Sequence, residues 1–202
     1  GRLSRIVGEL QNAGPNVLRN VTLGITIHTG AGSPLLAELT PSIVSLTGHP
    51  YIETLLPGQK SPFEFLYTGL AYSVTDVQIL NYTIAEGSPY QSLRLNDVSA
   101  NFEPGEIKSP SSQDPYARFY GPISSFHVTG IVDNEGFSTV KNVRIVVTFY
   151  DKDGVMVDGV FWFSDPSKLK PNQTGDFEIV TRVRADEVAT FIVQYAAQAA
   201  AN

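Results

Sequence analysis

Cysteine is absent from this sequence of 202 residues. A disulfide framework and a thiolate metal site are therefore excluded. Charge is also scarce, because charged residues make up 17% of the chain, against roughly 25% in ordinary soluble domains. The net charge is −6 and Lys and Arg form no cluster. Both features argue against nucleic-acid binding, which relies on clustered basic side chains.

The shortage of charge is concentrated in the first part of the chain. Residues 1–84 carry nine charged side chains: Arg2, Arg5, Glu9, Arg19, Glu38, Glu53, Lys60, Glu64 and Asp76. A surface with so few charges is typical of a face that another domain or subunit covers. A solvated Ser/Thr/Asn surface is the alternative interpretation.

No apolar run reaches the roughly 18 residues that a membrane-spanning helix needs, and no signal peptide is recognisable at the start. Residue 1 is Gly1 and the only methionine is Met156. We therefore expect that a signal peptide or a tag preceded residue 1. Removal of a signal peptide fits a secreted protein.

Motifs of common catalytic sites are missing too. There is no G-x-S-x-G elbow, no Walker loop and no G-x-G-x-x-G. The histidines His28, His49 and His127 are far apart in the sequence, which favours surface or turn positions over zinc ligation. We expect no catalytic residues, no metal site and no cofactor.

One acidic segment is a candidate calcium site. Asp151-x-Asp153-Gly154, with Asp158 nearby, offers carboxylates of the kind that Ca²⁺ binds. The third acid and the bidentate Glu of an EF-hand loop are missing, so an Asp-Gly hairpin turn is the preferred interpretation. Asp165, before Pro166, is expected to cap a turn.

What the sequence does contain is a β-strand pattern, clearest between Ser125 and Val183. One run places four apolar side chains on one face at period two: Val143, Ile145, Val147 and Phe149. The segment 151–154 ends this run and 155–163 begins the next, which predicts a hairpin. Strands at this spacing, with no helical period between them, predict an antiparallel β-sandwich.

The chain also repeats itself. Residues 6–28 align without gaps to residues 128–150. The identical positions are Gly8, Asn12, Gly14, Asn20, Val21 and Thr26, which meet Gly130, Asn134, Gly136, Asn142, Val143 and Thr148. A second block aligns Leu55, Pro57, Gln59, Phe63 and Glu64 with Leu169, Pro171, Gln173, Phe177 and Glu178. The first copy has about eight extra residues between the blocks, in the region 30–50.

The repeat predicts two tandem immunoglobulin-like antiparallel β-sandwiches. We expect the first at 1–86, the second at 123–202, and a linker at 87–122 with a possible short strand at Leu93, Leu95 and Val98. The shared Asn-x-Gly elements are expected to adopt left-handed backbone in tight turns. Pro57 and Pro171 are expected to preset φ at the first corner of another turn.

About 60 residues of the second repeat carry a pattern known from a protein family. The pattern comprises Gly130, Asn134, Gly136, Val143, the run Val147-Thr148-Phe149-Tyr150-Asp151, Gly154, Leu169, Pro171 and Phe177. It resembles the FxLYD family of extracytoplasmic immunoglobulin-like domains in archaeal and bacterial surface proteins. The first repeat resembles it more weakly, with His28-Thr29 in place of Tyr-Asp. The resemblance implies a sandwich, an exported location and no catalytic residues.

Two kinds of surface site are candidates. Trp162 lies between Phe161 and Phe163, so at least one ring faces outward from a strand, either as a ligand platform or subunit contact or as part of core and domain packing. Three Asn-x-Ser/Thr sequons are possible glycan acceptors: Asn20, Asn81 and Asn172. Asn172 lies in a predicted turn. Asn20 aligns with Asn142, which has no sequon, so a structural reason for asparagine competes there.

The function that these patterns favour is a non-enzymatic, exported structural protein. It would self-assemble through β-strand and domain contacts into a pilus- or thread-like filament or a surface layer, with no nucleic-acid partner and no membrane span. The alternative is an extracellular carbohydrate- or protein-binding module. The candidates for a donated strand are residues 2–10 and 190–198, and we favour 2–10, with Leu3, Ile6 and Val7. An ordinary first strand that pairs within its own domain is the alternative explanation of residues 2–10.

Overall fold

The computed structural model describes residues 3–29, 42–68, 73–85, 92–103, 125–181 and 187–200. The named elements within these ranges are twelve β-strands, whose pairings are all antiparallel. The predicted all-β class is confirmed. No helix within these ranges has the length and apolar character to cross a membrane. The chain divides into two compact units, Gly1–Pro89 and Tyr90–Asn202, called here the N-terminal and the C-terminal unit.

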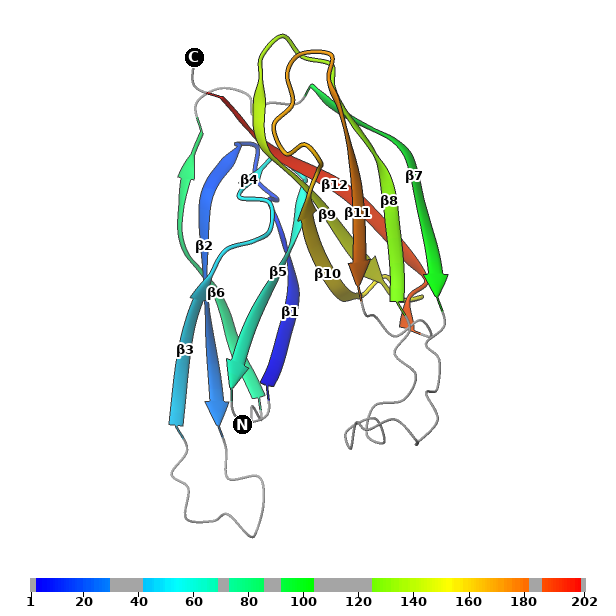
Figure 1. The fold of residues 1–202 in the computed structure, drawn as a ribbon. Helices are drawn as coiled ribbons and strands as arrows, with labels where there is room; N and C mark the ends of the chain where they lie inside the picture. Colours follow the sequence, from blue (N-terminus) through cyan, green and yellow to red (C-terminus); the bar gives the residue numbers. More distant parts are fainter. Residues whose placement is uncertain are drawn as a thin grey trace. The chain divides into compact units, whose positions relative to one another are not determined.

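The described residues of the N-terminal unit contain six strands: β1 (Leu3–Gln11), β2 (Leu18–Thr29), β3 (Ser42–Gly48), β4 (Thr54–Leu55), β5 (Lys60–Thr68) and β6 (Ser73–Ile84). β1 pairs with β5, and β2 pairs with β3, β4 and β6 (Figure 1). The core-facing side chains of β2 are almost fully buried: Val21, Leu23, Ile25 and Ile27. β2 is therefore the central strand of this unit.

Six strands also lie in the part of the C-terminal unit that the structure describes: β7 (Leu93–Glu103), β8 (Ser125–Asn134), β9 (Val140–Tyr150), β10 (Met156–Phe163), β11 (Thr174–Thr181) and β12 (Thr190–Ala199). They form two three-stranded sheets, β11-β8-β7 and β10-β9-β12. One core cluster draws on both sheets: Leu93, Val128, Val132, Val140, Val143, Ile145, Val147, Phe149, Leu169, Phe177 and Ile179. The period-two face predicted for β9 lies in this core.

The aligned segments of the repeat occupy equivalent strands. β1, β2 and β5 correspond to β8, β9 and β11, and they pair in the same way. Gly8 lies opposite Phe63 as Gly130 lies opposite Phe177. A Cβ atom on Gly130 would lie 2.6 Å from Cζ of Phe177, so the ring takes the space that a side chain would need. This close approach explains why both copies keep glycine and phenylalanine.

The Asn-x-Gly elements are held by buried asparagine side chains. Asn134, which is 1% exposed, donates from its amide to the carbonyl oxygens of Ser138 (2.9 Å) and Leu169 (3.0 Å). Its side-chain oxygen accepts a hydrogen bond from the Gly136 amide at 3.1 Å. Asn12 makes the equivalent three bonds in the N-terminal unit. Asparagine is therefore favoured here because one side chain makes hydrogen bonds to three backbone groups, two carbonyls and one amide.

The prediction of left-handed backbone at these Asn-x-Gly elements is wrong. The positive φ angles occur at other positions, among them two aligned pairs: Asn20 (54°) with Asn142 (53°), and Gly58 (78°) with Asn172 (60°). The left-handed backbone at Asn20 is a structural reason for asparagine at this position, independent of glycosylation. The turn at Pro57 and that at Pro171 each place the left-handed residue directly after the proline, as a type II turn requires.

Part of the predicted linker is a strand. The expected short strand at Leu93 and Leu95 extends to Glu103 as β7, and it pairs with β8 in the C-terminal unit. The unit boundary lies at Pro89 and Tyr90, and residues 104–124 lie outside the described residues.

Candidate functional site

The N-terminal unit exposes an apolar strand, β6. Five of its large side chains are 45–58% exposed: Val77, Ile79, Leu80, Tyr82 and Ile84. Ile79 lies opposite Leu23, which is 1% exposed, and antiparallel partners share one face of a sheet. Ile79 therefore lies on the core-facing side of the sheet and is nevertheless open to solvent.

A groove of about 290 Å³ lies beside these side chains. Its lining comprises residues 10–16 at the end of β1 and in the following turn, Leu18 and Val21 of β2, Leu55, and Ile79, Tyr82 and Ile84 of β6. No lining residue is charged. The groove is consequently suited to an apolar occupant.

The edge of β1 belongs to the same region. β5 is the only strand in the described ranges that pairs with β1. Ile6 and Leu10 of β1 are half-buried, whereas their counterparts in β8, Val128 and Val132, are fully buried. The groove, the exposed strand β6 and the edge of β1 together form the candidate site.

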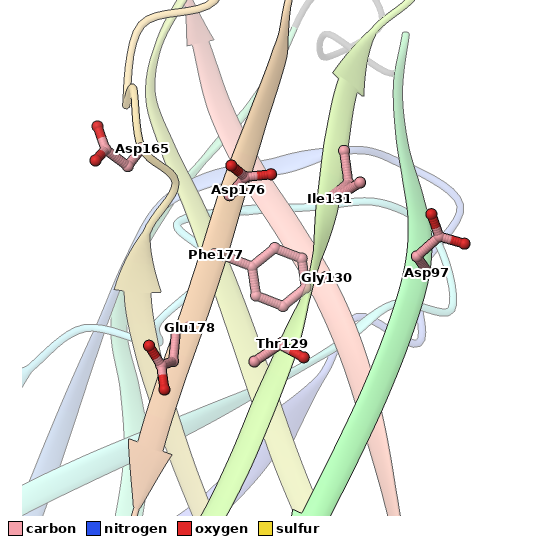
Figure 2. Close-up of a pocket in the computed structure, with 8 residues that line it drawn as sticks. All are labelled: Asp97, Thr129, Gly130, Ile131, Asp165, Asp176, Phe177 and Glu178. Atoms are coloured by element: carbon pink, nitrogen blue, oxygen red, sulfur yellow. The ribbon is translucent and has the colours of Figure 1, made fainter.

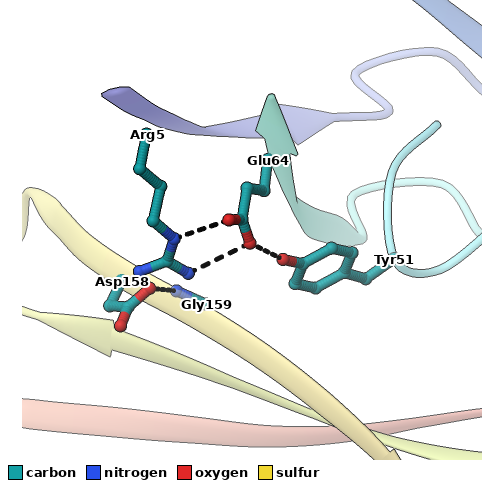
Figure 3. Close-up of polar contacts among 5 residues, drawn as sticks. All are labelled: Arg5, Tyr51, Glu64, Asp158 and Gly159. Carbon is teal, nitrogen blue, oxygen red and sulfur yellow. Dashed lines mark hydrogen bonds and ion pairs between the residues drawn. The ribbon is translucent and has the colours of Figure 1, made fainter. Parts of the chain in front are cut away.

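A polar cluster lies elsewhere in the same unit, on the outer face of β1 and β5. Figure 3 shows the carboxylate of Glu64 between Arg5 and Tyr51. The Arg5 guanidinium donates two bonds to it, at 2.7 and 3.1 Å, and the Tyr51 hydroxyl donates one at 2.6 Å. The repeat places His127 and Glu178 at the positions of Arg5 and Glu64, 3.4 Å apart. Both units therefore use this position for a cross-strand ion pair.

The cluster shifts the pKa values of two side chains, Tyr51 and Glu64. Burial raises the pKa of Tyr51, and its hydrogen bond to Glu64 and the charge of that carboxylate raise it further. Burial acts to raise the pKa of Glu64 as well, but the hydrogen bonds from Arg5 and Tyr51 and the charge of Arg5 outweigh it, so that this pKa is lowered. The carboxylate is thus held ionised and the phenol neutral, which suits a structural tie.

The C-terminal unit has an acidic depression of about 470 Å³ on the β11-β8-β7 sheet. Figure 2 shows Asp97, Asp165, Asp176 and Glu178 around it, with the Phe177 ring beside Gly130. Within the described ranges, no three His, Cys, Asp or Glu side chains are arranged to hold a metal ion. The depression is an acidic, solvent-facing surface.

Ser125, His127 and Glu178 lie in a row on this sheet. The Ser125 hydroxyl is 3.5 Å from Nε2 of His127, and Nδ1 of His127 is 3.4 Å from Glu178. These distances exceed the 2.6–3.2 Å reach of a nucleophile and its base. Glu103 also contacts Nε2 of His127, at 3.3 Å. The arrangement is that of a surface network of ion pairs.

The aromatic candidates lie at the end of β10. Trp162 is 62% exposed and Phe163 37%, while Phe161 is half-buried. The Arg144 guanidinium stacks over Phe161 at 4.6 Å and contacts Phe163 at 5.7 Å. Of these three rings, Trp162 therefore has the largest solvent-exposed fraction.

The sequon asparagines Asn20, Asn81 and Asn172 are all exposed. They lie at the start of β2, on β6 and in the turn before β11. Each is an exposed candidate acceptor within its own unit.

The acidic segment at 151–154 is a turn. The Asp151 carboxylate accepts hydrogen bonds from the amides of Asp153 (2.9 Å) and Val155 (2.8 Å), and Gly154 has φ of 75°. Asp158 is 3% exposed and accepts a hydrogen bond from the Gly159 amide at 2.7 Å (Figure 3). Both carboxylates are therefore engaged in hydrogen bonds that stabilise the local fold.

The side chain of His28 lies outside the described residues, and the ring of His49 contacts the carbonyl of Val21.

The predicted donor residues Leu3, Ile6 and Val7 belong to β1, which pairs with β5 of the same unit along nine residues. The second predicted donor, 190–198, lies in β12 and pairs with β9.

Sequence reasoning did not find the groove. No family model, curated protein or solved structure matches this chain.

Proposed function

We propose that the chain is a non-enzymatic, exported structural protein, built of two immunoglobulin-like sandwiches, that assembles into a cell-surface filament or surface layer. The observation that carries the proposal is the edge of β1 beside an uncharged groove and the exposed strand β6. An unpaired strand edge is a template for another chain. Assembly would pair that edge and cover the apolar side chains in one contact.

Other observations support parts of the proposal. The core of the C-terminal unit joins residues of two three-stranded sheets, as in a sandwich. The resemblance to extracytoplasmic domains favours export. The nine charges of residues 1–84 favour a surface that a subunit covers.

Self-assembly is tested by light scattering after size exclusion, over a range of concentrations, and by negative-stain microscopy. We expect masses that rise with concentration in multiples of 21.9 kDa, and filaments or sheets in native material. Ile79→Lys should abolish this association. Ile192→Lys is the matched control, because Ile192 is also exposed (47%) but lies on β12. A chain that stays monomeric at every concentration would refute the proposal.

Export is tested by the intact mass of protein from its native host. We expect glycan increments above 21.9 kDa, with peptide mapping that places one at Asn172, since this residue is exposed in a turn. An unmodified native mass would remove this support for export.

A second candidate function rests on Trp162. An exposed indole beside a partly exposed phenyl ring is a platform of the kind that sugars or protein partners contact. Titration on a glycan array, with Trp162→Ala as the control, tests this module. Binding that the substitution leaves unchanged would exclude Trp162 as its anchor.

A further inference from the structure

Strand β6 is exposed along all of its described side chains, and one of its edges is open. Every residue from 76 to 84 is exposed. In the part of the chain that the structure describes, β2 is the one strand that pairs with β6. Natural edge strands commonly carry Lys, Pro or inward-pointing charges that prevent pairing with another chain. β6 contains neither Lys nor Pro, and its one charge is Asp76, near its start.

A bulge divides β6 into two halves. The register with β2 shifts between Ile79 and Asn81, so Leu80 is an extra residue. A Cβ atom on Gly24 would lie 2.8 Å from Cδ1 of Leu80. Gly24 alternates with the buried side chains of β2 and therefore lies on the outer face of the sheet, so Leu80 lies on that face too. The extra residue reverses the alternation of faces in the second half of the strand.

The apolar side chains on the core-facing side of β6 consequently form a symmetric pattern. Val77 and Ile79 lie opposite buried residues of β2, and Ile79, Tyr82 and Ile84 line the groove. The four are placed evenly about the midpoint between residues 80 and 81, so the pattern is the same in both strand directions. A two-fold contact between identical strands needs such symmetry, because residue i meets residue j and j meets i.

We propose that β6 forms the contact of a two-fold dimer, in which it pairs antiparallel with β6 of a second copy of this chain. The inference rests on the self-association in the proposed function and names one of its contacts. The two-fold axis passes between residues 80 and 81. Ile79 then lies opposite Tyr82 of the second copy, and Val77 lies opposite Ile84. The pairing joins the β2-containing sheets of the two copies into one continuous sheet.

The bulge selects this register over its neighbours. A shift of one residue would place the core-facing Ile79 opposite Asn81, which lies on the outer face with its partner Thr22. A shift of two residues keeps the faces but retains one kind of apolar pair in place of two. Charge agrees with the proposed register, because the Asp76 side chains of the two copies would lie about 30 Å apart, beyond the roughly 10 Å over which salt leaves charges unscreened.

The symmetry of β6 also identifies the partner as a second copy, since a strand of another protein would require no such pattern. A two-fold contact closes on itself. A filament or layer of these dimers therefore needs a second contact, and the edge of β1 that has no partner in the described ranges is available for it.

Two single-cysteine variants test the register, because the chain contains no cysteine. Gln78 and Thr83 are exposed and lie opposite each other in the proposed dimer. Opposed residues of antiparallel strands have Cα atoms about 4.5–5.5 Å apart, within the range of about 4.4–6.8 Å that a disulfide bridges. We expect oxidation of mixed Gln78→Cys and Thr83→Cys chains to give disulfide-linked dimers. Each variant alone should give none, because its two thiols lie about 17 Å apart across the axis. A mixture that cross-links no more than the separate variants would overturn the contact.

A charge pair tests the same contact in solution, with light scattering after size exclusion as the measurement. Ile79→Glu and Tyr82→Lys should each weaken dimerisation by about 100-fold, because each substitution occurs twice across the axis. The equimolar mixture should recover dimers, since one Glu–Lys pair and one unchanged Ile–Tyr pair then form. Ile43→Lys is the matched control, because Ile43 is 66% exposed on β3 of the same sheet, and it should dimerise like the original chain. No recovery in the mixture would overturn the register.

The outcomes separate this inference from the proposed function. If filaments or layers form without the cross-link between positions 78 and 83, the two-fold contact is overturned and the proposed function stands. If cross-linked dimers form but nothing larger, the two-fold contact stands and the filament or layer is overturned. A chain that stays monomeric at every concentration overturns both.

Discussion

Replacing Asn134 by alanine should destabilise the C-terminal unit severely. The side chain is 1% exposed and makes three hydrogen bonds to backbone groups. Its loss leaves the carbonyls of Ser138 and Leu169 and the amide of Gly136 without these partners. The Leu169 carbonyl keeps the hydrogen bond from the Val140 amide and Ser138 is exposed, so the buried Gly136 amide is the group left unsatisfied. Leaving a buried polar group unsatisfied costs about 1–3 kcal/mol, and we expect a loss of about 2 kcal/mol.

The assay is urea denaturation followed by the fluorescence of Trp162, the only tryptophan of the chain, which therefore reports on the C-terminal unit. With a slope of about 2 kcal/mol/M, the midpoint should fall by about 1 M. Asn12→Ala removes the equivalent bonds from the N-terminal unit, so it should change the circular dichroism transition. Asn101→Ala, at an exposed position of β7, is the control and should change the free energy by less than about 0.5 kcal/mol. A fluorescence midpoint for Asn134→Ala equal to that of the control would refute the reasoning.

Three further predictions follow from the same contacts. Gly130→Ala brings a Cβ atom within 2.6 Å of the Phe177 ring and 3.2 Å of the Asn96 carbonyl, so we expect a loss of about 2 kcal/mol in the fluorescence assay; an unchanged midpoint would contradict it. Asn172→Gly should be neutral, because Gly58 holds the same left-handed position, whereas Asn172→Val should cost about 1–2 kcal/mol; equal effects would refute this. Since the folded pKa of Glu64 lies below its ordinary value, its stabilisation is present above that value and is lost as pH falls through the folded pKa. Glu64→Gln should therefore weaken the acid sensitivity of the N-terminal unit, measured by circular dichroism melts between pH 6 and 3, and an unchanged sensitivity would exclude the ion pair as its cause.

The sequence predicted the parts of the fold that repeat with a regular period. Val143, Ile145, Val147 and Phe149 are all fully buried, as the alternation predicted. Val146 and Thr148 between them are fully buried as well, so β9 is buried on both faces, which the period-two pattern did not indicate. The internal alignment also indicated equivalent strands. It identified Asn134 but gave the wrong reason, since hydrogen bonds to three backbone groups cannot be read from spacing.

β7 shows where the pattern failed. Asp97 has φ of 51° and the register shifts between Asn96 and Ser99, so the alternation of Leu93 and Leu95 does not continue. The sequence therefore predicted a short strand in a linker instead of the third strand of a sheet. The groove was missed for a related reason, because the exposure of Ile79 on the core-facing side of β6 depends on the pairing of strands in space.

The energetics of the groove indicate what the proposed assembly contact needs. Three side chains of β6 line the groove and are about half exposed: Ile79, Tyr82 and Ile84. Covering them would gain about 2–5 kcal/mol, taking about 1.5–3 kcal/mol for full burial of each. Association costs about 4–15 kcal/mol in lost freedom alone, so apolar contact with β6 does not suffice for a stable complex. A partner strand that also forms main-chain hydrogen bonds along the edge of β1 would add a second contribution in the same contact, so removal of either should weaken the proposed assembly far more than its own share.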